Sequence, residues 1–165
     1  MTGSLKAKQL DPLAVFEQWL PEACEEGFSP QERKEAFAAL HECGLPHRKI
    51  EAWKYTDPSG AATGPFDRPH HCGYGLIAPD VVQMDTLRAF PDIGTQHPFA
   101  LLSHALSHGG LEFFVPPNTV LDEPVQIRIP VVAENSLVCP VIRIRVAEGS
   151  KADFIFRSES QKKGS

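Results

Sequence analysis

The stretch "PVQIRIPV", residues 124 to 131, decides the expected fold because apolar and polar residues alternate along it. Successive side chains of a β-strand point to opposite faces, so this alternation predicts a strand with one buried face. The stretch "VIRIRV", residues 141 to 146, alternates in the same way, and "ADFIF" follows it after the turn sequence "AEGS". The buried face of the first stretch is expected to consist of Val125, Ile127, Ile129 and Val131.

Turn-forming pairs separate these expected strands, namely Pro117-Asn118 and Gly149-Ser150. Pro130 and Pro140 lack the N–H group that a strand ladder needs, so their strands should be interrupted there or lie at a sheet edge. Short strands of this kind occur in solenoids, sandwiches and barrels. The periodicity alone leaves all three architectures open.

The sequence before the strands has a helical period. Asp11 followed by Pro12 is typical of a helix start, and apolar residues then recur at helical spacing until Pro21. The stretch "SPQE", residues 29 to 32, has the form of a capping box and predicts the start of a second helix. Gly44 is placed to end that helix in a left-handed conformation.

Residues 58 to 75 contain three prolines and four glycines without an apolar period, which predicts a long irregular connection. Beyond it, "DTLRAF", residues 85 to 90, is expected to form a short helix. Another helix is expected in "HPFALLSHALSHGG", residues 97 to 110, with Phe99, Leu102 and Leu106 on one face.

The expected fold class is therefore α+β, with helices first and strands after them. An N-terminal helical segment covers residues 1–57, an irregular linker with short helices covers 58–110, and a β segment covers 111–165.

Charge and composition exclude two classes of partner. The chain has 165 residues, a formal net charge of −5 and no stripe of lysine and arginine, so the attraction that drives nucleic-acid binding is missing. No apolar run approaches the ~20 residues needed to cross a bilayer, and the N-terminus lacks the apolar core of an export signal. We therefore expect a cytoplasmic protein whose four scattered cysteines are reduced thiols.

Seven histidines suggest a metal site, and the densest group is "HHC", residues 70 to 72. Adjacent side chains diverge, however, so three consecutive residues seldom close on one ion. His104 and His108 are spaced i, i+4 on the expected helix and His97 stands at its start, but Ala105 occupies the position where metalloproteases place a glutamate. Loop positions are therefore favoured for His70 and His71, and surface or interface positions for His97, His104 and His108. The alternative is a small cupin-like β-barrel enzyme that draws its metal ligands from them.

Other catalytic patterns are missing from the sequence. It contains neither G-x-S-x-G nor a glycine-rich phosphate loop, and its acidic residues are scattered. We therefore expect a protein that is not an enzyme, with no catalytic residues and no metal ligands.

A candidate binding surface lies in "GLPHRKIEAWKYTD", residues 44 to 57. Trp and Tyr bury their rings while keeping one polar atom near water, and Arg and Lys side chains can lie over those rings. The segment is either a packed corner where a helix ends or a recognition surface, because Trp, Tyr and Arg dominate interface hot spots. The residues alone favour the packed corner. The side chains concerned are Arg48, Lys49, Trp53, Lys54 and Tyr55.

This segment resembles the N-terminal signature of the SufB/SufD family, closest to its SufD branch, which reads G-L-P-x-R-[KR]-x-E-x-W-K-Y-T. The matching residues are Gly44, Leu45, Pro46, Arg48, Lys49, Glu51, Trp53, Lys54, Tyr55 and Thr56. A second stretch, residues 97 to 127, resembles the family's entry into its β region, although Ser103 and His104 stand where the family often has asparagine. The second match is carried by Phe99, Leu102, Ala105, Gly109, Pro117, Leu121, Pro124, Val125 and Ile127.

The resemblance implies a component of the SUF machinery for iron–sulfur cluster assembly, built around a right-handed parallel β-helix. Such proteins work in a complex with the scaffold SufB and the ATPase SufC. It also implies that this chain corresponds to an N-terminal portion with the first coils of the β-helix, because the family's residues for ATPase docking and cluster building lie beyond the matched motifs. We therefore expect a non-catalytic scaffold or partner protein that binds no cofactor itself, while the wider complex handles the cluster.

An incomplete solenoid leaves backbone groups and apolar side chains uncovered at its end. The β segment is therefore expected either to self-associate through its β edges or to close into a compact sandwich. A β-sandwich module that binds a small ligand or a peptide is a third possibility.

Overall fold

The computed structural model describes residues 11–20, 28–49, 51–58, 66, 69, 73–91, 97–107, 109–131 and 135–160. These residues form helices and two small sheets, so the predicted α+β class is confirmed. No helix in the described ranges is long and apolar enough to cross a membrane.

The first two helices begin where the sequence predicts caps. Helix α1 (Pro12–Glu17) starts at Asp11, whose side chain accepts a hydrogen bond from a backbone N–H in the first turn. Helix α2 (Pro30–Cys43) starts with the expected capping box. The hydroxyl of Ser29 accepts from the backbone N–H of Glu32, and the carboxylate of Glu32 accepts from the backbone N–H of Ser29, so two backbone donors are satisfied.

Helix α2 ends at Gly44, which has a positive φ of 74° that residues with a Cβ rarely adopt. A single turn of 3₁₀-helix, η2 (Glu51–Trp53), follows it. The last helix, α4 (Pro98–Leu106), begins after His97 with proline at its first position.

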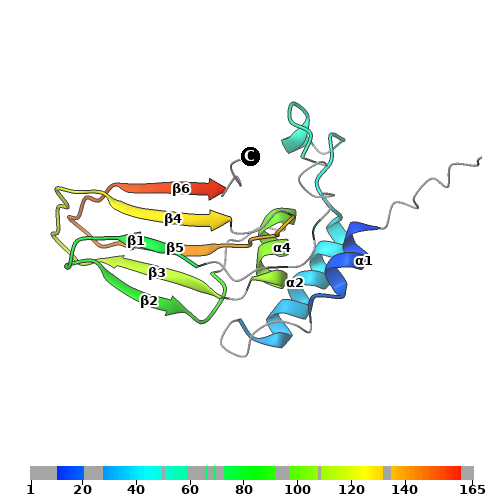
Figure 1. Cartoon of the computed structure of the whole chain (residues 1–165), viewed down its shortest axis with the longest axis horizontal. Helices are drawn as coiled ribbons and strands as arrows, with labels where there is room; N and C mark the ends of the chain where they lie inside the picture. The colour runs from blue at the N-terminus through cyan, green and yellow to red at the C-terminus, as the bar shows by residue number, and fades with distance from the viewer. Residues whose placement is uncertain are drawn as a thin grey trace, which may run out of the picture.

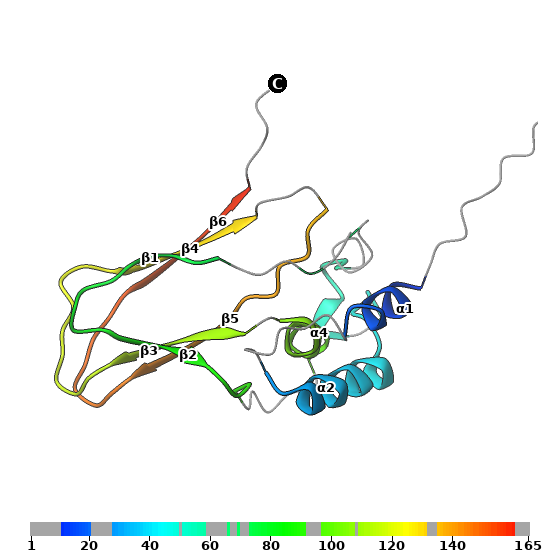
Figure 2. The same ribbon diagram turned by 60° about the horizontal axis from the view of Figure 1, so that its bottom comes forward.

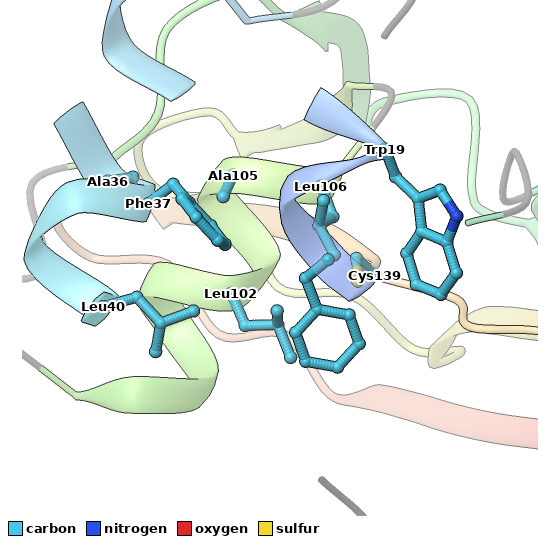
Figure 3. Packing of buried hydrophobic residues seen from close by; sticks show 9 residues of the cluster. Trp19, Ala36, Phe37, Leu40, Leu102, Ala105, Leu106 and Cys139 are labelled. Carbon is cyan, nitrogen blue, oxygen red and sulfur yellow. The ribbon is translucent and has the colours of Figure 1, made fainter. Parts of the chain in front are cut away.

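Helices α1, α2 and α4 pack around one apolar cluster, which Figure 3 shows from close by. The buried guanidinium of Arg33 on α2 donates a 2.7 Å hydrogen bond from Nε to the carbonyl oxygen of Ala105 on α4. Leaving such a buried donor unpaired costs about 1–3 kcal/mol, so this bond favours one arrangement of the two helices. The buried members of the cluster are Phe16, Trp19, Ala36, Phe37, Leu40, Leu102, Ala105, Leu106 and Cys139.

The strands of the described chain form two sheets of three strands each. The first sheet has the order β1-β4-β6, with β1 at Gly75–Ile77, β4 at Val125–Val131 and β6 at Phe154–Ser160. The second has the order β2-β3-β5, with β2 at Gln83–Leu87, β3 at Gly110–Val115 and β5 at Val141–Val146. In each sheet the first pair of strands is antiparallel and the second pair is parallel. Figure 2 shows the two sheets as facing layers, and Figure 1 shows the helices beyond one end of the strands.

The parallel pairs repeat at a nearly constant interval along the chain. Gly110 of β3 pairs with Val141 of β5, 31 positions later, and Val125 of β4 pairs with Phe154 of β6, 29 positions later. Strands β3 and β4 therefore form one pass of the chain through the two sheets, and β5 and β6 form a second pass in the same direction. The turn after β3, residues 116–124, lies against the turn after β5, residues 147–153 (Figure 1).

Backbone hydrogen bonds join these two turns. The N–H of Asn118 donates to the carbonyl of Glu148 at 3.0 Å, and the N–H of Leu121 donates to the carbonyl of Lys151 at 2.9 Å. A Cβ atom at Gly149 would lie only 2.5 Å from Oδ1 of Asn118, and Gly149 has a φ of 73°, so this position requires glycine. The turns predicted at Pro117-Asn118 and Gly149-Ser150 are therefore confirmed.

Alternate residues of the strands fill the space between the sheets. Val125 and Ile127 are fully buried there, as the sequence predicts, and Phe113 of β3 lies opposite them. Ile129 is half-buried in the same cluster. The rings of Phe113 and Phe154 meet edge-on with centroids 6.0 Å apart. This interior layer is the core of the β segment.

A third apolar cluster joins the helices to the sheet β2-β3-β5. Phe28, just before α2, packs with Leu87 of β2 and Val141 of β5, and the half-buried Phe90 completes the group. Because its members come from both parts of the chain, this cluster holds the helical part against the sheet.

Two local predictions are wrong. Residues 85–90 do not form a helix, because Gln83–Leu87 is strand β2, paired antiparallel with β3. That pairing buries Leu87, and tertiary pairing outweighs the weak helical pattern of six residues. Helix α1 ends at Glu17, before the expected stop at Pro21.

Pro130 behaves as the sequence predicts. It lies inside β4, but β1 pairs with β4 only from Gln126 to Arg128. On that side β4 is therefore an edge at Pro130, where a missing N–H costs no ladder hydrogen bond.

Candidate functional site

The first candidate site is the aromatic-basic corner, which we define as Arg48, Lys49, Trp53, Lys54 and Tyr55. It follows the end of α2, where Gly44 and the buried Pro46 turn the chain out of the helix. The single turn η2 then places Trp53 on one side and leads directly into Lys54 and Tyr55.

Trp53 anchors the corner to the start of α4. Its ring lies 5.6 Å from the ring of His97 and 5.6 Å from that of Phe99, the latter pair meeting edge-on at 84°. Such geometry is favoured because the positive edge of one ring meets the negative face of the other. Trp53 is half-buried and packs against the start of α4.

Tyr55 does not pack, which corrects the expectation that both rings of the corner are buried. It is 92% exposed, and the ammonium group of Lys54 lies 5.5 Å from the centre of its ring. The chain turns at Lys54 and Tyr55, where the N–H of Thr56 donates to the carbonyl of Trp53 at 3.1 Å, so one ring faces α4 and the other faces solvent. Tyr55 is the most exposed of the large apolar or aromatic side chains that the structure describes.

The charges of the corner are partly compensated. Arg48 Nε lies 2.9 Å from a carboxylate oxygen of Asp57, and Lys54 Nζ lies 3.6 Å from one of Glu51. Lys49 is exposed and forms no ion pair with a described residue. Tyrosine and arginine are enriched in protein–protein interfaces, so the corner is a candidate binding surface.

The second candidate site is the open edge, which we define as the outer sides of strands β5 and β6. Each is the last strand of its sheet, and no further strand pairs with it among the residues that the structure describes. Figure 1 shows β6 as the uppermost strand. The parallel register shows which residues of these strands continue the interior rows. Ile144 follows Phe113, Val146 follows Val115, and Phe156 follows Ile127.

These paired residues differ sharply in exposure. Ile127 is 0% exposed and Phe156 is 50% exposed, although both face the space between the sheets. Ile144 and Val146 are likewise exposed while their partners Phe113 and Val115 are fully buried. The exposed members are apolar because they continue a core, and they are exposed because nothing in the described chain lies beyond them.

A charged group lies on the outer face of the sheet β2-β3-β5. Nη2 of Arg143 donates a 2.6 Å hydrogen bond to Oε2 of Glu112, and Arg145 pairs with the other carboxylate oxygen. The guanidinium of Arg145 also lies 5.0 Å from the centre of the Phe114 ring. These contacts link β3 to β5 and place a guanidinium beside each carboxylate oxygen of Glu112.

The hydrogen bond from Arg143 holds the pKa of the Glu112 carboxyl below its ordinary value. Desolvation of the carboxyl acts in the opposite direction, and the charges of Arg143 and Arg145 add to the lowering. The sequence signal for this group was the outward pair of arginines in "VIRIRV". Only the register of β3 against β5 shows that Glu112 faces both of them.

The histidines considered as metal ligands are dispersed. His97 is exposed beside Trp53, and His104, in the last turn of α4, lies among phenyl rings. Within the described ranges no three His, Cys, Asp or Glu side chains gather closely enough to hold a metal ion. The predictions for His70, His71 and His108 fall outside those ranges.

A shallow groove of about 540 Å³ lies between α1 and α2. Its apolar floor includes Leu20 and Phe37, and its rim carries Glu17, Lys34 and His41. Because the rim has both signs of charge, the groove favours neither an anionic nor a cationic ligand.

No protein-family model matches the sequence, and no curated protein matches it significantly.

Proposed function

We propose that this chain is a SufD-like component of the SUF system for iron–sulfur cluster assembly and acts as a non-catalytic scaffold or partner protein. The order of its parts supports the proposal. A helical lead-in, the motif of residues 44–56 and a helix at residues 98–106 precede a β segment, in the order that the family resemblance implies.

The observation that carries the proposal is the repeated parallel register. Strands β3 and β5 pair 31 positions apart, β4 and β6 pair 29 positions apart, and the turns between them are hydrogen-bonded to each other. Two passes of this kind are what successive coils of a parallel β-helix require. A parallel crossover in one sheet is right-handed in about 98% of known cases, which favours the right-handed form.

In this proposal the antiparallel strands β1 and β2 cover the first coil. They pair with β4 and β3 on the side away from the second coil, so the first coil is covered on both sides. Solenoids need such atypical terminal units because an uncovered coil exposes its backbone and its core. The open edge lies at the opposite end of the stack.

The chain contributes a binding surface and not a cluster site. The aromatic-basic corner offers an exposed ring and a cation for contact with a SufB-like or SufC-like partner. The iron–sulfur cluster is the cargo of the complex, and we assign no residue of this chain to it or to any other cofactor. The proposed place of action is the cytoplasm.

The test is co-purification of this chain with SufB-like and SufC-like proteins produced in the same cells. The proposal predicts a stable complex that Tyr55→Ala weakens. Met84→Ala is the matched control, because Met84 is also a large exposed side chain but lies on β2. Failure of the unaltered chain to bind either protein would overturn the proposal. Equal effects of the two variants would show that the corner is not the binding surface.

A further inference from the structure

Among the described residues no strand pairs with the outer side of β6, so the open edge exposes its backbone groups together with Phe156, which continues a buried row. Edges of this type pair with another strand unless they are covered or repel one another. The charges on each strand therefore decide whether a second copy of the same strand can serve as the partner.

Strand β5 is unsuited to pairing with itself. When two copies of a strand pair antiparallel about a two-fold axis, each residue lies opposite a residue from the same face of the other copy. Arg143 and Arg145 share the outer face of β5. A pairing centred on Arg143, Ile144 or Arg145 therefore sets arginine against arginine.

Strand β6, in contrast, is suited to pairing with a second copy of itself. Arg157 and Glu159 share its outer face and flank Ser158. A two-fold axis through Ser158 would place Arg157 of each copy opposite Glu159 of the other. Cross-strand pairs of opposite charge stabilise a sheet, and this arrangement contains two of them.

Arg157 also lacks an ion-pair partner among the residues that the structure describes. It lies directly opposite Arg128 of β4 in the parallel register, so two cations are neighbours on one face. The acidic side chain beside them is Glu159, whose carboxylate is 3.9 Å from Nε of Arg128. Within the described residues Arg157 forms no ion pair, and a second copy would supply one.

We propose that a second copy of this chain pairs antiparallel with β6 about a two-fold axis at Ser158, joining two β1-β4-β6 sheets into one continuous sheet. The pairing satisfies the exposed backbone groups of β6 and brings the two Phe156 side chains onto the same face. It rests on the register of β4 and β6 and not on the SUF assignment, so either proposal can fail while the other holds.

The test uses two charge reversals in the full chain, R157E and E159R, with mass measured by analytical ultracentrifugation. Each variant alone would set like charges opposite each other at both positions, so self-association should weaken by about tenfold or more. An equimolar mixture of the two should dimerise again, because the two acidic side chains of R157E then face the two arginines of E159R. This rescue also shows that both variants are folded.

Matched controls are Asp80→Lys and Lys151→Glu, which change the charge equally at exposed turn positions away from β6. They should dimerise like the unaltered chain. A monomeric unaltered chain at all concentrations would overturn the proposal. So would a dimer that is insensitive to the two reversals, variants that do not associate when mixed, or an assembly larger than a dimer.

Discussion

The imidazole ring of His104 lies flat against the phenyl ring of Phe90, with ring centroids 3.9 Å apart and planes inclined by 7°. Phe28 meets the same imidazole edge-on at 5.8 Å. Nε2 of His104 is buried and has no hydrogen-bond partner among the described residues. His104 therefore lies beside the cluster that holds the helices against the sheet, in a place that suits the neutral ring.

Burial lowers the pKa of His104 below its ordinary value of 6.5. Among the charges of α2, Glu32 and Glu35 act to raise the pKa and Arg33 acts to lower it. The unfolded chain then binds more protons than the folded chain between the two pKa values. Stability should therefore fall as the pH drops below 6.5 and level off below the folded pKa.

The variant His104→Phe should lose part of this pH dependence, because phenylalanine keeps an aromatic ring in place and cannot be charged. Denaturant unfolding above and below the ordinary histidine pKa measures the effect. His97→Phe is the control and should keep the pH dependence, because His97 is exposed. An unchanged pH dependence in His104→Phe would refute this account of His104.

Trp53 and Tyr55 should differ in their contribution to stability. Truncation of a fully buried tryptophan to alanine lowers the free energy of unfolding by about 3–5 kcal/mol. Because Trp53 is half-buried, Trp53→Ala should lower it by about 1.5–2.5 kcal/mol. Tyr55→Ala should change the free energy of unfolding by less than about 0.5 kcal/mol, because its ring is in solvent. Thermal unfolding of both variants checks this pair. A loss for Trp53→Ala as small as that for Tyr55→Ala would show that the contacts with His97 and Phe99 contribute little.

Ile127 and Phe156, which are neighbours in one interior row, should also differ in their contribution to stability. Ile127→Ala should destabilise the chain by about 2–5 kcal/mol because it leaves a cavity between the sheets. Phe156→Ala should cost less than about 1.5 kcal/mol, because half of the ring is already in water. Urea unfolding in the R157E background separates this effect from self-association. Equal losses would mean that the open edge is covered in solution.

Glu112 should titrate below the ordinary glutamate value of 4.5, because its carboxylate accepts a hydrogen bond from Arg143. Its contribution to stability is present above 4.5 and should disappear as the pH falls through the folded pKa. Carboxyl chemical shifts in an NMR titration measure the midpoint. Arg143→Gln should raise the midpoint more than Arg145→Gln, since the Arg143 hydrogen bond is the main cause. The reverse order would assign the lowering to Arg145.

The local elements were largely predictable from the sequence, because caps, turn residues and alternation act over a few neighbouring positions. Asp11, Ser29 and Gly44 bound their helices as expected, and β4 and β5 lie where the alternation predicts them. Strand β2 was not predictable in this way, since its conformation depends on pairing with β3.

The candidate sites depend on spatial relationships that a linear pattern does not contain. Ile127 and Phe156 have the same alternating context, yet only the position of β6 at the end of its sheet makes Phe156 exposed. In the same way Trp53 and Tyr55 are only two residues apart, and the turn that follows η2 decides which ring meets α4. The contact of Glu112 with two arginines depends on the register of β3 and β5.

The order of strand pairing tests the central claim most directly, because a coil and an antiparallel barrel share the same alternating sequence. Backbone nuclear Overhauser contacts in the isotope-labelled chain report that order. The account predicts parallel contacts between Phe113 and Ile144 and between Ile127 and Phe156. Antiparallel contacts between the consecutive strands β3 and β4, without contacts from β3 to β5, would contradict it.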